Sequence, residues 1–242
     1  MREILAALEM TASMFTILPL PCTRWDEKLR PLATALLPVV GLGIGLVWRL
    51  LAALGGRLPA HLAGAIIATA PWLMTGFIHL DGFLDASDAL LSWRAREERQ
   101  RILKDVHVGA FAVVSLAILS LFQFAAAMEL KRVGALVFLP VLSRCGSARC
   151  ALKMPPLGQS EYAGMNGAEK LIRIPDAAAL LSMIFLAILY GWPGFIAGSV
   201  VLAGYAAAIM ISVRSLGGFS GDLAGYALTV SELCGIIALA IL

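Results

Sequence analysis

Residues 108–129 read VGAFAVVSLAILSLFQFAAAME and carry one charged side chain, Glu129, at their end. A helix needs about 20 mostly apolar residues to cross the hydrocarbon core of a bilayer. Six more stretches of this kind surround it, at 33–54, 60–80, 133–151, 174–192, 193–213 and 223–242. The sequence therefore predicts an all-α, polytopic membrane helix bundle with about seven transmembrane helices, preceded by an amphipathic N-terminal helix over 2–15.

The composition agrees with a membrane protein. The chain has 242 residues, of which 60% are hydrophobic and 14% are charged, whereas soluble domains average about 45–50% and about 25%. This excess excludes a disordered chain and argues against a soluble enzyme. No long linker divides the sequence, so we expect a single integral-membrane domain over 1–242.

Several classes of site and partner are disfavoured. A net charge of +3 gives no indication of nucleic-acid binding. The four cysteines, at 22, 145, 150 and 234, form no CxxC pair and no Cys/His cluster, which argues against a zinc site or a disulfide framework. No cleavable signal peptide is expected, because the N-terminus lacks the charged, apolar and small-residue order of one.

Lys and Arg set the orientation, because cytoplasmic loops carry an excess of both. With the N-terminus in the cytoplasm, thirteen of the 19 Lys and Arg residues fall on the cytoplasmic side and three fall outside. The remaining three, Arg49, Arg144 and Arg149, lie within spans. The same orientation puts the polar segments 81–107, 152–173 and 214–222 in the cytoplasm, where we expect the active residues.

An acidic motif begins where the second span ends. Asp81, Asp85 and Asp88 stand at i, i+4 and i+7, so they share one face of a helix. Like charges stacked in this way repel each other, and a divalent cation removes the repulsion. Oxygen ligands without Cys or His partners suit Mg²⁺, which takes one or two carboxylates plus substrate phosphates and water. The alternative is a solvated acidic face that caps the next helix.

Further candidates follow the acidic motif. Asp105 precedes the third span, where a metal ligand and a helix N-cap are equally compatible with the sequence. Lys104 and the arginines before it suit either a phosphate or an ordinary charged helix. His79 and His107 suit a general base, a phosphate donor or a structural role.

A second constellation lies after the sixth span. Three glycines, at 217, 218 and 221, precede a helix and can present backbone N–H groups to a phosphate, although glycines also serve in tight loops. Asp222 and Glu232 lie on one helical face, and an intramembrane carboxylate such as Glu232 is a functional candidate because its burial is costly. Asp222 is alternatively a helix N-cap.

Two features of the spans concern packing. Gly41 and Gly45 are spaced for close helix–helix contact. Arg144 lies within the fourth span, so we expect it to face the bundle interior, where it meets a phosphate or a carboxylate.

These residues together make the chain similar to the cobalamin synthase family, also called adenosylcobinamide-GDP ribazoletransferases. The resemblance rests on the motif His-Leu-Asp-Gly-x-x-Asp-x-x-Asp at 79–88, on Lys104-Asp105, on Ser220-Gly221-Asp222 followed by Glu232, and on weaker matches at 15–21 and 38–41. The chain departs from the family at Phe77 and Ala89, where Gly is usual, and at Ile17 and His107, where Arg is common.

The resemblance implies a phosphoryl transfer in a prokaryotic cell (inner) membrane, with Mg²⁺ as the cofactor. A hydroxyl of α-ribazole, or of its 5′-phosphate, attacks the cobinamide-side phosphorus of adenosylcobinamide-GDP; GMP leaves, and the lower nucleotide loop closes. Such chemistry needs charge neutralisation and positioning more than covalent catalysis. Whether the protein forms a homo-oligomer stays open.

The resemblance and the acidic chemistry lead to one set of expected site residues. We expect Asp81 and Asp85 to hold the metal, with Asp88 as a further ligand or as the base. The catalytic candidates are Asp81, Asp85, Asp88 and Asp105; the metal ligands are Asp81, Asp85, Asp88 and Asp222; the substrate-binding candidates are His79, Lys104, Arg144, Ser220 and Glu232.

Two rival functions remain. A CDP-alcohol phosphotransferase also uses a membrane-edge aspartate cluster with Mg²⁺, but its motif Asp-Gly-x-x-Ala-Arg is not matched, because Asp81-Gly82 is followed by Leu84-Asp85 and not by Ala-Arg. A transporter with a carboxylate relay needs carboxylates near the middle of the bilayer, and only Glu232 qualifies.

Overall fold

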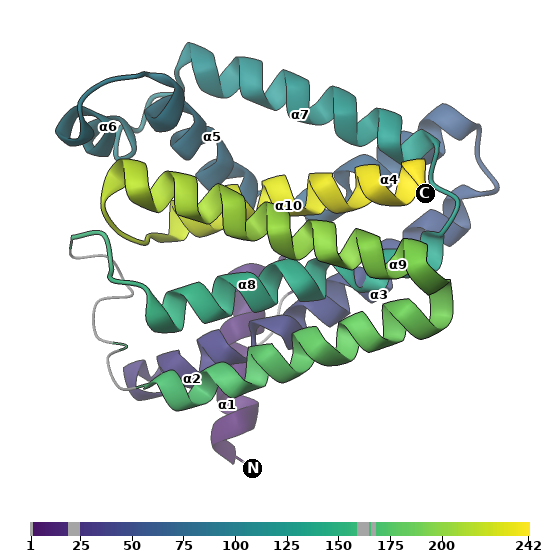
Figure 1. Cartoon of the computed structure of the whole chain (residues 1–242), viewed down its shortest axis with the longest axis horizontal. Coiled ribbons are helices and arrows are strands. Elements are labelled where there is room, and N and C mark those ends of the chain that lie inside the picture. Colours follow the sequence, from purple (N-terminus) through teal and green to yellow (C-terminus); the bar gives the residue numbers. More distant parts are fainter. Residues whose placement is uncertain (1, 19–24, 159–164, 166–167) are drawn as a thin grey trace.

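The structure is a computed structural model, and it describes residues 2–18, 25–158, 165 and 168–242. These residues form helices and no β-strand (Figure 1). The ten α-helices are α1 (Arg2–Phe15), α2 (Arg30–Ala35), α3 (Leu37–Gly55), α4 (Ala60–Met74), α5 (Ile78–Leu91), α6 (Arg96–Ile102), α7 (Ala110–Met128), α8 (Leu139–Lys153), α9 (Arg173–Leu216) and α10 (Gly221–Ile241). Three short 3₁₀ helices are η1 (Glu27–Leu29), η2 (Val133–Val137) and η3 (Ala168–Ile172). Cys22, Arg24 and the prolines at 19 and 21 lie outside the described residues.

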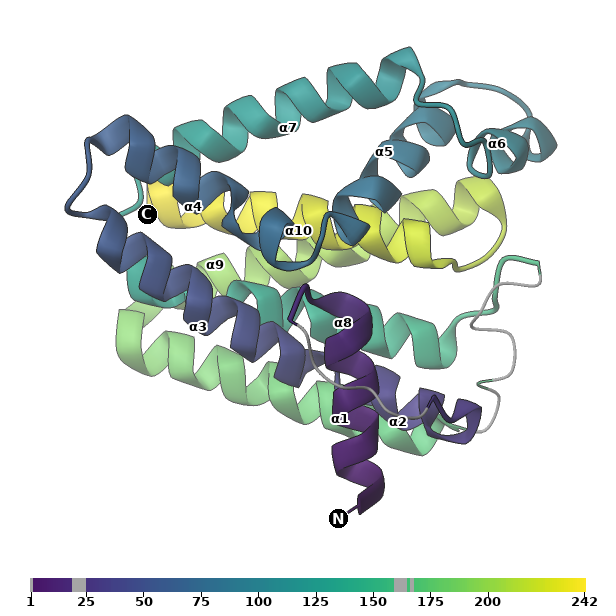
Figure 2. The ribbon, with the colours of Figure 1, turned by 180° about the vertical axis from the view of Figure 1, so that it is seen from behind.

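The predicted membrane bundle is confirmed in outline. Among the described residues, five helices are long and apolar enough to cross a membrane, and the pair α4–α5 makes a sixth if it counts as one broken span. Helix α9 kinks at Gly191, where φ is 65° and ψ is −152°, and its two arms run side by side in opposite directions (Figures 1 and 2). With these arms as two crossings, the total becomes seven, as the apolar stretches predict.

The second predicted span, 60–80, is not one straight helix. Helix α4 ends at Met74, and α5 starts at Ile78 after a bend of 91°. Two consecutive residues at the bend have left-handed backbones, Gly76 with φ 60° and Phe77 with φ 65°. The polar segment predicted from residue 81 onward is therefore wrong for 81–91, which continue α5 into the bundle. The acidic motif lies on a packed helix and not in a loop.

Helix α8 is the most deeply buried of the long apolar helices. Helix α8 and the preceding η2 pack against α3 where Gly41 and Gly45 lie: a Cβ on Gly41 would collide with the Pro140 carbonyl of α8, and one on Gly45 with the Val137 carbonyl of η2. The predicted close contact through these glycines is confirmed. Arg144 of α8 is enclosed by protein, whereas Arg149 is exposed and forms an ion pair with Asp176 of α9. Burial of one arginine and pairing of the other explain how a weakly apolar span is accommodated.

The polar segments gather at one end of the bundle. Helix α6 binds the end of α9, because Arg96 donates to the Arg214 carbonyl at 3.1 Å and Gln100 donates to the Leu216 carbonyl at 2.6 Å. On the other side, the Leu157 N–H donates to the Phe219 carbonyl at 2.7 Å. The segments before α7, after α8 and before α10 therefore meet, as the loop prediction requires.

The predicted amphipathic helix is α1, which runs across the long helices (Figure 2). It buries Ala7, Met10 and Thr11 against the bundle, and the Thr11 hydroxyl donates to the Ala33 carbonyl at 2.8 Å. Its end reaches the bend between α4 and α5, where the Ile17 N–H donates to the Met74 carbonyl at 3.0 Å. Helix α1 thereby forms one wall beside the acidic motif.

Candidate functional site

The three aspartates of α5 have graded exposure along one helical face. Asp81 is exposed, Asp85 is half-buried and Asp88 is buried. Asp81, Asp222 and Asp88 all act electrostatically on Asp85, so these four carboxylates lie in one region of the structure. The structure thus joins the two acidic motifs, which are separated by more than a hundred residues in the sequence.

Small residues allow this meeting. A Cβ on Gly82 would lie 2.8 Å from the Cα of Asp222, and a Cβ on Gly225 would lie 3.0 Å from the His79 carbonyl oxygen. The Thr229 hydroxyl also donates to that carbonyl, at 3.3 Å. Helices α5 and α10 are therefore in backbone contact at the point where they carry the acidic side chains. The predicted shared face of Asp222 and Glu232, on which Gly225 and Thr229 also lie, is the face that meets α5 and α8.

A cavity of about 160 Å³ opens beside this contact. Four predicted site residues line it: His79 and Asp81 from α5, Arg144 from α8, and Asp222 from α10. Apolar side chains and Ser147 complete the wall, and the ring of Phe15 from α1 stacks on His79 with a centroid distance of 5.9 Å. Acidic groups, a guanidinium and an aromatic wall thus share one small space.

Asp88 has a different structural task. Its carboxylate accepts the N–H of Gly109 at 2.6 Å and the N–H of Ala112 at 2.9 Å. These groups belong to the first turn of α7, whose N–H donors lack partners within the helix. A carboxylate supplied by another helix thus caps α7. Asp88 is thus a capping acid, as in the alternative, but it is buried and not solvated, and the helix that it caps is α7 and not the next one, α6. Its roles as metal ligand and base stay predictions.

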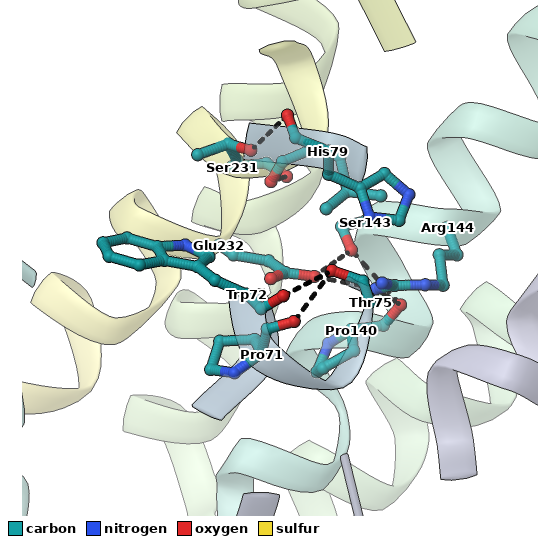
Figure 3. A network of polar contacts seen from close by, with 11 residues as sticks. Pro71, Trp72, Thr75, His79, Pro140, Ser143, Arg144, Ser231 and Glu232 are labelled. Atoms are coloured by element: carbon teal, nitrogen blue, oxygen red, sulfur yellow. Dashed lines mark hydrogen bonds and ion pairs between the residues drawn. The ribbon is translucent and has the colours of Figure 1, made fainter. Parts of the chain in front are cut away.

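Arg144 and Glu232 form a buried ion pair behind the cavity (Figure 3). Arg144 Nη1 lies 2.9 Å from Glu232 Oε1, and the Ser143 hydroxyl donates to the same oxygen at 2.8 Å. Arg144 is 1% exposed and Glu232 is 5% exposed. The structure thus gives the intramembrane Glu232 a cationic partner, and it places Arg144 against a carboxylate, one of the two partners expected for it.

In the glycine-containing loop before α10, backbone groups are engaged in hydrogen bonds and close contacts within the protein. The Gly217 N–H donates to the Val213 carbonyl and the Phe219 N–H donates to the Pro155 carbonyl, at 2.7 and 2.9 Å. A Cβ on Gly218 would lie 2.6 Å from the Cα of Leu157. Gly217 and Gly218 therefore serve a tight loop, the second of the two predicted roles. Gly221 lines the cavity, and its contact with a phosphate stays a prediction.

Ser220 is the N-cap of α10, and its hydroxyl accepts the Leu223 N–H at 3.4 Å. The alternative of an N-cap for Asp222 is thus wrong, and Asp222 lies in the first turn with its side chain at the cavity. The proposed substrate contact of Ser220 stays a prediction.

Lys104 and Asp105 lie away from the cavity, on the exposed segment between α6 and α7. The ring Nδ1 of His107 is 2.7 Å from Asp105 Oδ1, and the His107 N–H donates to the same oxygen at 3.0 Å. Hydrogen bonds from the His107 side chain and backbone lower the pKa of the Asp105 carboxyl. Within the described residues, then, neither Lys104 nor Asp105 joins the other candidates.

Phe15 and Ser147 are among the cavity residues that the sequence interpretation did not name as site residues. Phe15 belonged only to a weakly matching N-terminal stretch, and no spacing rule places it over His79. Ser147 follows Arg144 by three residues on the same helix, so an i, i+3 search from the buried arginine finds it. No three His, Cys, Asp or Glu side chains of the described residues converge as a preformed metal site.

Comparisons with known proteins point in one direction. The family described as cobalamin-5-phosphate synthase matches residues 7–240. A Clostridium perfringens protein named adenosylcobinamide-GDP ribazoletransferase is 37% identical over 100% of both chains. Proteins of the same name from Clostridium botulinum and Pseudomonas syringae are 37% and 35% identical, over 98% and 76% of this chain and 98% and 77% of their own. No solved structure matches the chain.

Proposed function

The chain belongs to the cobalamin-5-phosphate synthase family, and from this premise we propose that it transfers α-ribazole, or its 5′-phosphate, to adenosylcobinamide-GDP with release of GMP. The observation that carries the proposal is the cavity between α5, α8 and α10, where His79, Asp81 and Arg144 meet Asp222. It lies in a chain that aligns over its full length with relatives named for this activity.

The reaction balances as a single displacement at phosphorus. The acceptor hydroxyl oxygen forms a bond to the cobinamide-side phosphorus, and the bond from that phosphorus to the bridging oxygen of the diphosphate breaks. GMP departs with the bonding electrons, and the hydroxyl proton passes to a carboxylate at the site. Asp81 and Asp222 are the better candidates for that proton, because both line the cavity while Asp88 is engaged in capping α7.

Mg²⁺ fits the donor set of this site if the substrate completes it. Asp81 and Asp222 line one cavity and Asp85 interacts with both, so oxygen donors are available from two helices. Mg²⁺ usually takes only one or two carboxylates and fills its other positions with phosphate oxygens and water, so no preformed three-residue site is needed. When bound, the ion supplies neutralisation of the diphosphate charge.

We further propose that the bundle lies in the prokaryotic cell membrane with its polar end in the cytoplasm. The clustering of the segments before α7, after α8 and before α10 at one end supports a single polar face, and the excess of Lys and Arg supports its orientation. Ser92→Cys near that face should react with a membrane-impermeant thiol reagent only in opened cells, whereas Arg57→Cys should react in intact cells. The reverse labelling pattern would contradict this orientation and place the polar end outside the cell.

The direct test uses the purified full-length protein in lipid nanodiscs. With adenosylcobinamide-GDP and α-ribazole, we expect release of GMP in equal amount to the corrinoid product. EDTA should stop the reaction, and added Mg²⁺ should restore it. Absence of GMP release, or release that EDTA leaves unchanged, would contradict the transfer or the metal dependence respectively. Release of CMP from a CDP-alcohol would instead favour the phosphotransferase rival.

A further inference from the structure

Two residues that line the cavity beside the acidic side chains each carry a buried polar atom without a hydrogen-bond partner in the described part of the chain. Among the described residues, His79 Nδ1 and Arg144 Nε have no hydrogen-bond partner. An unpaired buried polar group costs about 1–3 kcal/mol, and native proteins keep few of them. Both residues line the same cavity, so a ligand seated there would lie beside both side chains.

The charge of this inner wall does not favour a free anion. The positive charge of Arg144 is already matched by Glu232 at 2.9 Å. Nearer the α5–α10 contact, Asp81 and Asp222 add negative charge to the cavity. An unaccompanied phosphate would meet repulsion on one side and a neutralised cation on the other. A neutral ligand with a hydrogen-bond acceptor suits the wall better.

The size and the remaining lining indicate an aromatic ligand. A cavity of about 150 Å³ lined by apolar side chains holds benzene, and this one has about 160 Å³. Its other walls include Phe15, Leu37 and Leu228. The Phe15 ring already stacks on His79 with an interplanar angle of 16°, so one side of the cavity is a flat aromatic surface.

We propose that this cavity is the subsite for the aromatic base of the acceptor nucleoside, with Arg144 Nε donating to a ring nitrogen. The inference rests on the proposed transfer and adds to it where the acceptor binds. A base seated between His79 and Arg144 leaves its ribose near Asp81 and Asp222, where the reacting hydroxyl is needed. The shape of the cavity then sets which bases are accepted.

The test changes the cavity without touching a charged residue. Leu228→Ala widens it, whereas Leu239→Ala makes the same deletion on the same helix, among core residues away from the cavity. We expect Leu228→Ala to raise kcat/KM for the riboside of the larger base naphthimidazole, relative to α-ribazole, by about ten-fold. Leu239→Ala should leave that ratio unchanged. Equal ratios in the two variants would overturn the subsite.

A binding measurement separates this inference from the proposed function. Ala224→Val narrows the cavity, and calorimetry in nanodiscs then reports binding of α-ribazole and of adenosylcobinamide-GDP separately. We expect the affinity for α-ribazole to fall about ten-fold while the affinity for adenosylcobinamide-GDP stays the same. Weakened binding of adenosylcobinamide-GDP alone would overturn the subsite and assign the cavity to that substrate. Absence of GMP release by the wild-type protein would contradict the transfer itself, whatever α-ribazole binding shows.

Discussion

Gly82 of α5 lies directly against the backbone of Asp222 at the start of α10, so closely that a Cβ would come within 2.8 Å of both the Cα and the carbonyl oxygen of Asp222. This contact brings the motif at 79–88 to the motif at 220–222. A backbone contact of this kind cannot be relieved by a side-chain rotation, because the obstructing atoms belong to a helix. The spacing between the acidic groups therefore depends on the absence of a side chain at residue 82.

Gly82→Ala should consequently reduce turnover. The added methyl group forces α5 and α10 apart, which displaces Asp81 from Asp222, and a misplacement of about 1 Å can cost about 10²-fold in rate. We expect kcat/KM to fall by about that factor in the GMP-release assay. Gly43→Ala is the matched control, since a Cβ on Gly43 meets nothing within 4 Å. Full activity of Gly82→Ala would show that the helix contact does not set the site geometry.

Asp81→Asn and Asp88→Asn should fail in different ways. Asp81 lines the cavity, and loss of a charge-stabilising group at a reacting centre costs about 10²–10³-fold in kcat; its exposed position predicts unchanged stability. Asp88 caps α7 through two N–H groups, and loss of a cap costs about 0.5–2 kcal/mol.

The two Asn variants are compared by GMP release and by unfolding in detergent. We expect Asp81→Asn to be inactive but stable, and Asp88→Asn to unfold earlier while it retains measurable turnover. If Asp88→Asn were fully stable and inactive, Asp88 would act at the reacting centre and the capping interpretation would be wrong.

Glu232→Gln should destabilise the bundle, because it leaves the buried Arg144 guanidinium without a counter-charge. Breaking a buried ion pair from one side costs about 3–5 kcal/mol, whereas replacing both partners by apolar residues is often neutral. The double variant Arg144→Met with Glu232→Leu should therefore recover stability in the unfolding measurement but not turnover, since Arg144 lines the cavity. A Glu232→Gln variant as stable as the wild type would show that the pair contributes nothing.

Hydropathy was sufficient for the number and approximate position of the spans, and helical spacing placed Asp81, Asp85 and Asp88 on one face. Helical spacing does not predict which other helices contact the face that carries these aspartates. Asp88 is engaged because the start of α7 returns to it, and this depends on the whole path through α6.

The partner of Arg144 could not be predicted from the sequence either, because Glu232 lies far along the chain and only helix packing brings the two residues together. Burial rules predicted that each charge needs a partner, and they left the choice between substrate and protein open. The bend at 75–77 was missed because residues 60–80 are mostly apolar, so hydropathy does not register a change of direction. One signal at the bend was Phe77, at a position where the resembling family usually has Gly.

The presence of Phe77 where the family usually has Gly leads to a substitution that should stabilise the protein, whereas most substitutions destabilise it. Phe77 has φ 65°, and a left-handed backbone costs a residue with a Cβ roughly 1–2 kcal/mol that glycine avoids. Phe77→Gly should therefore raise the free energy of unfolding by about 1 kcal/mol, provided that little packing is lost; the residue is 49% exposed. Phe122→Gly is the control, because Phe122 is 57% exposed but lies in the interior of the regular helix α7. There glycine should destabilise the protein by about 1 kcal/mol. The unfolding of both variants is measured in the same detergent, and a loss of stability in Phe77→Gly equal to that in Phe122→Gly would mean that the bend stores no backbone strain.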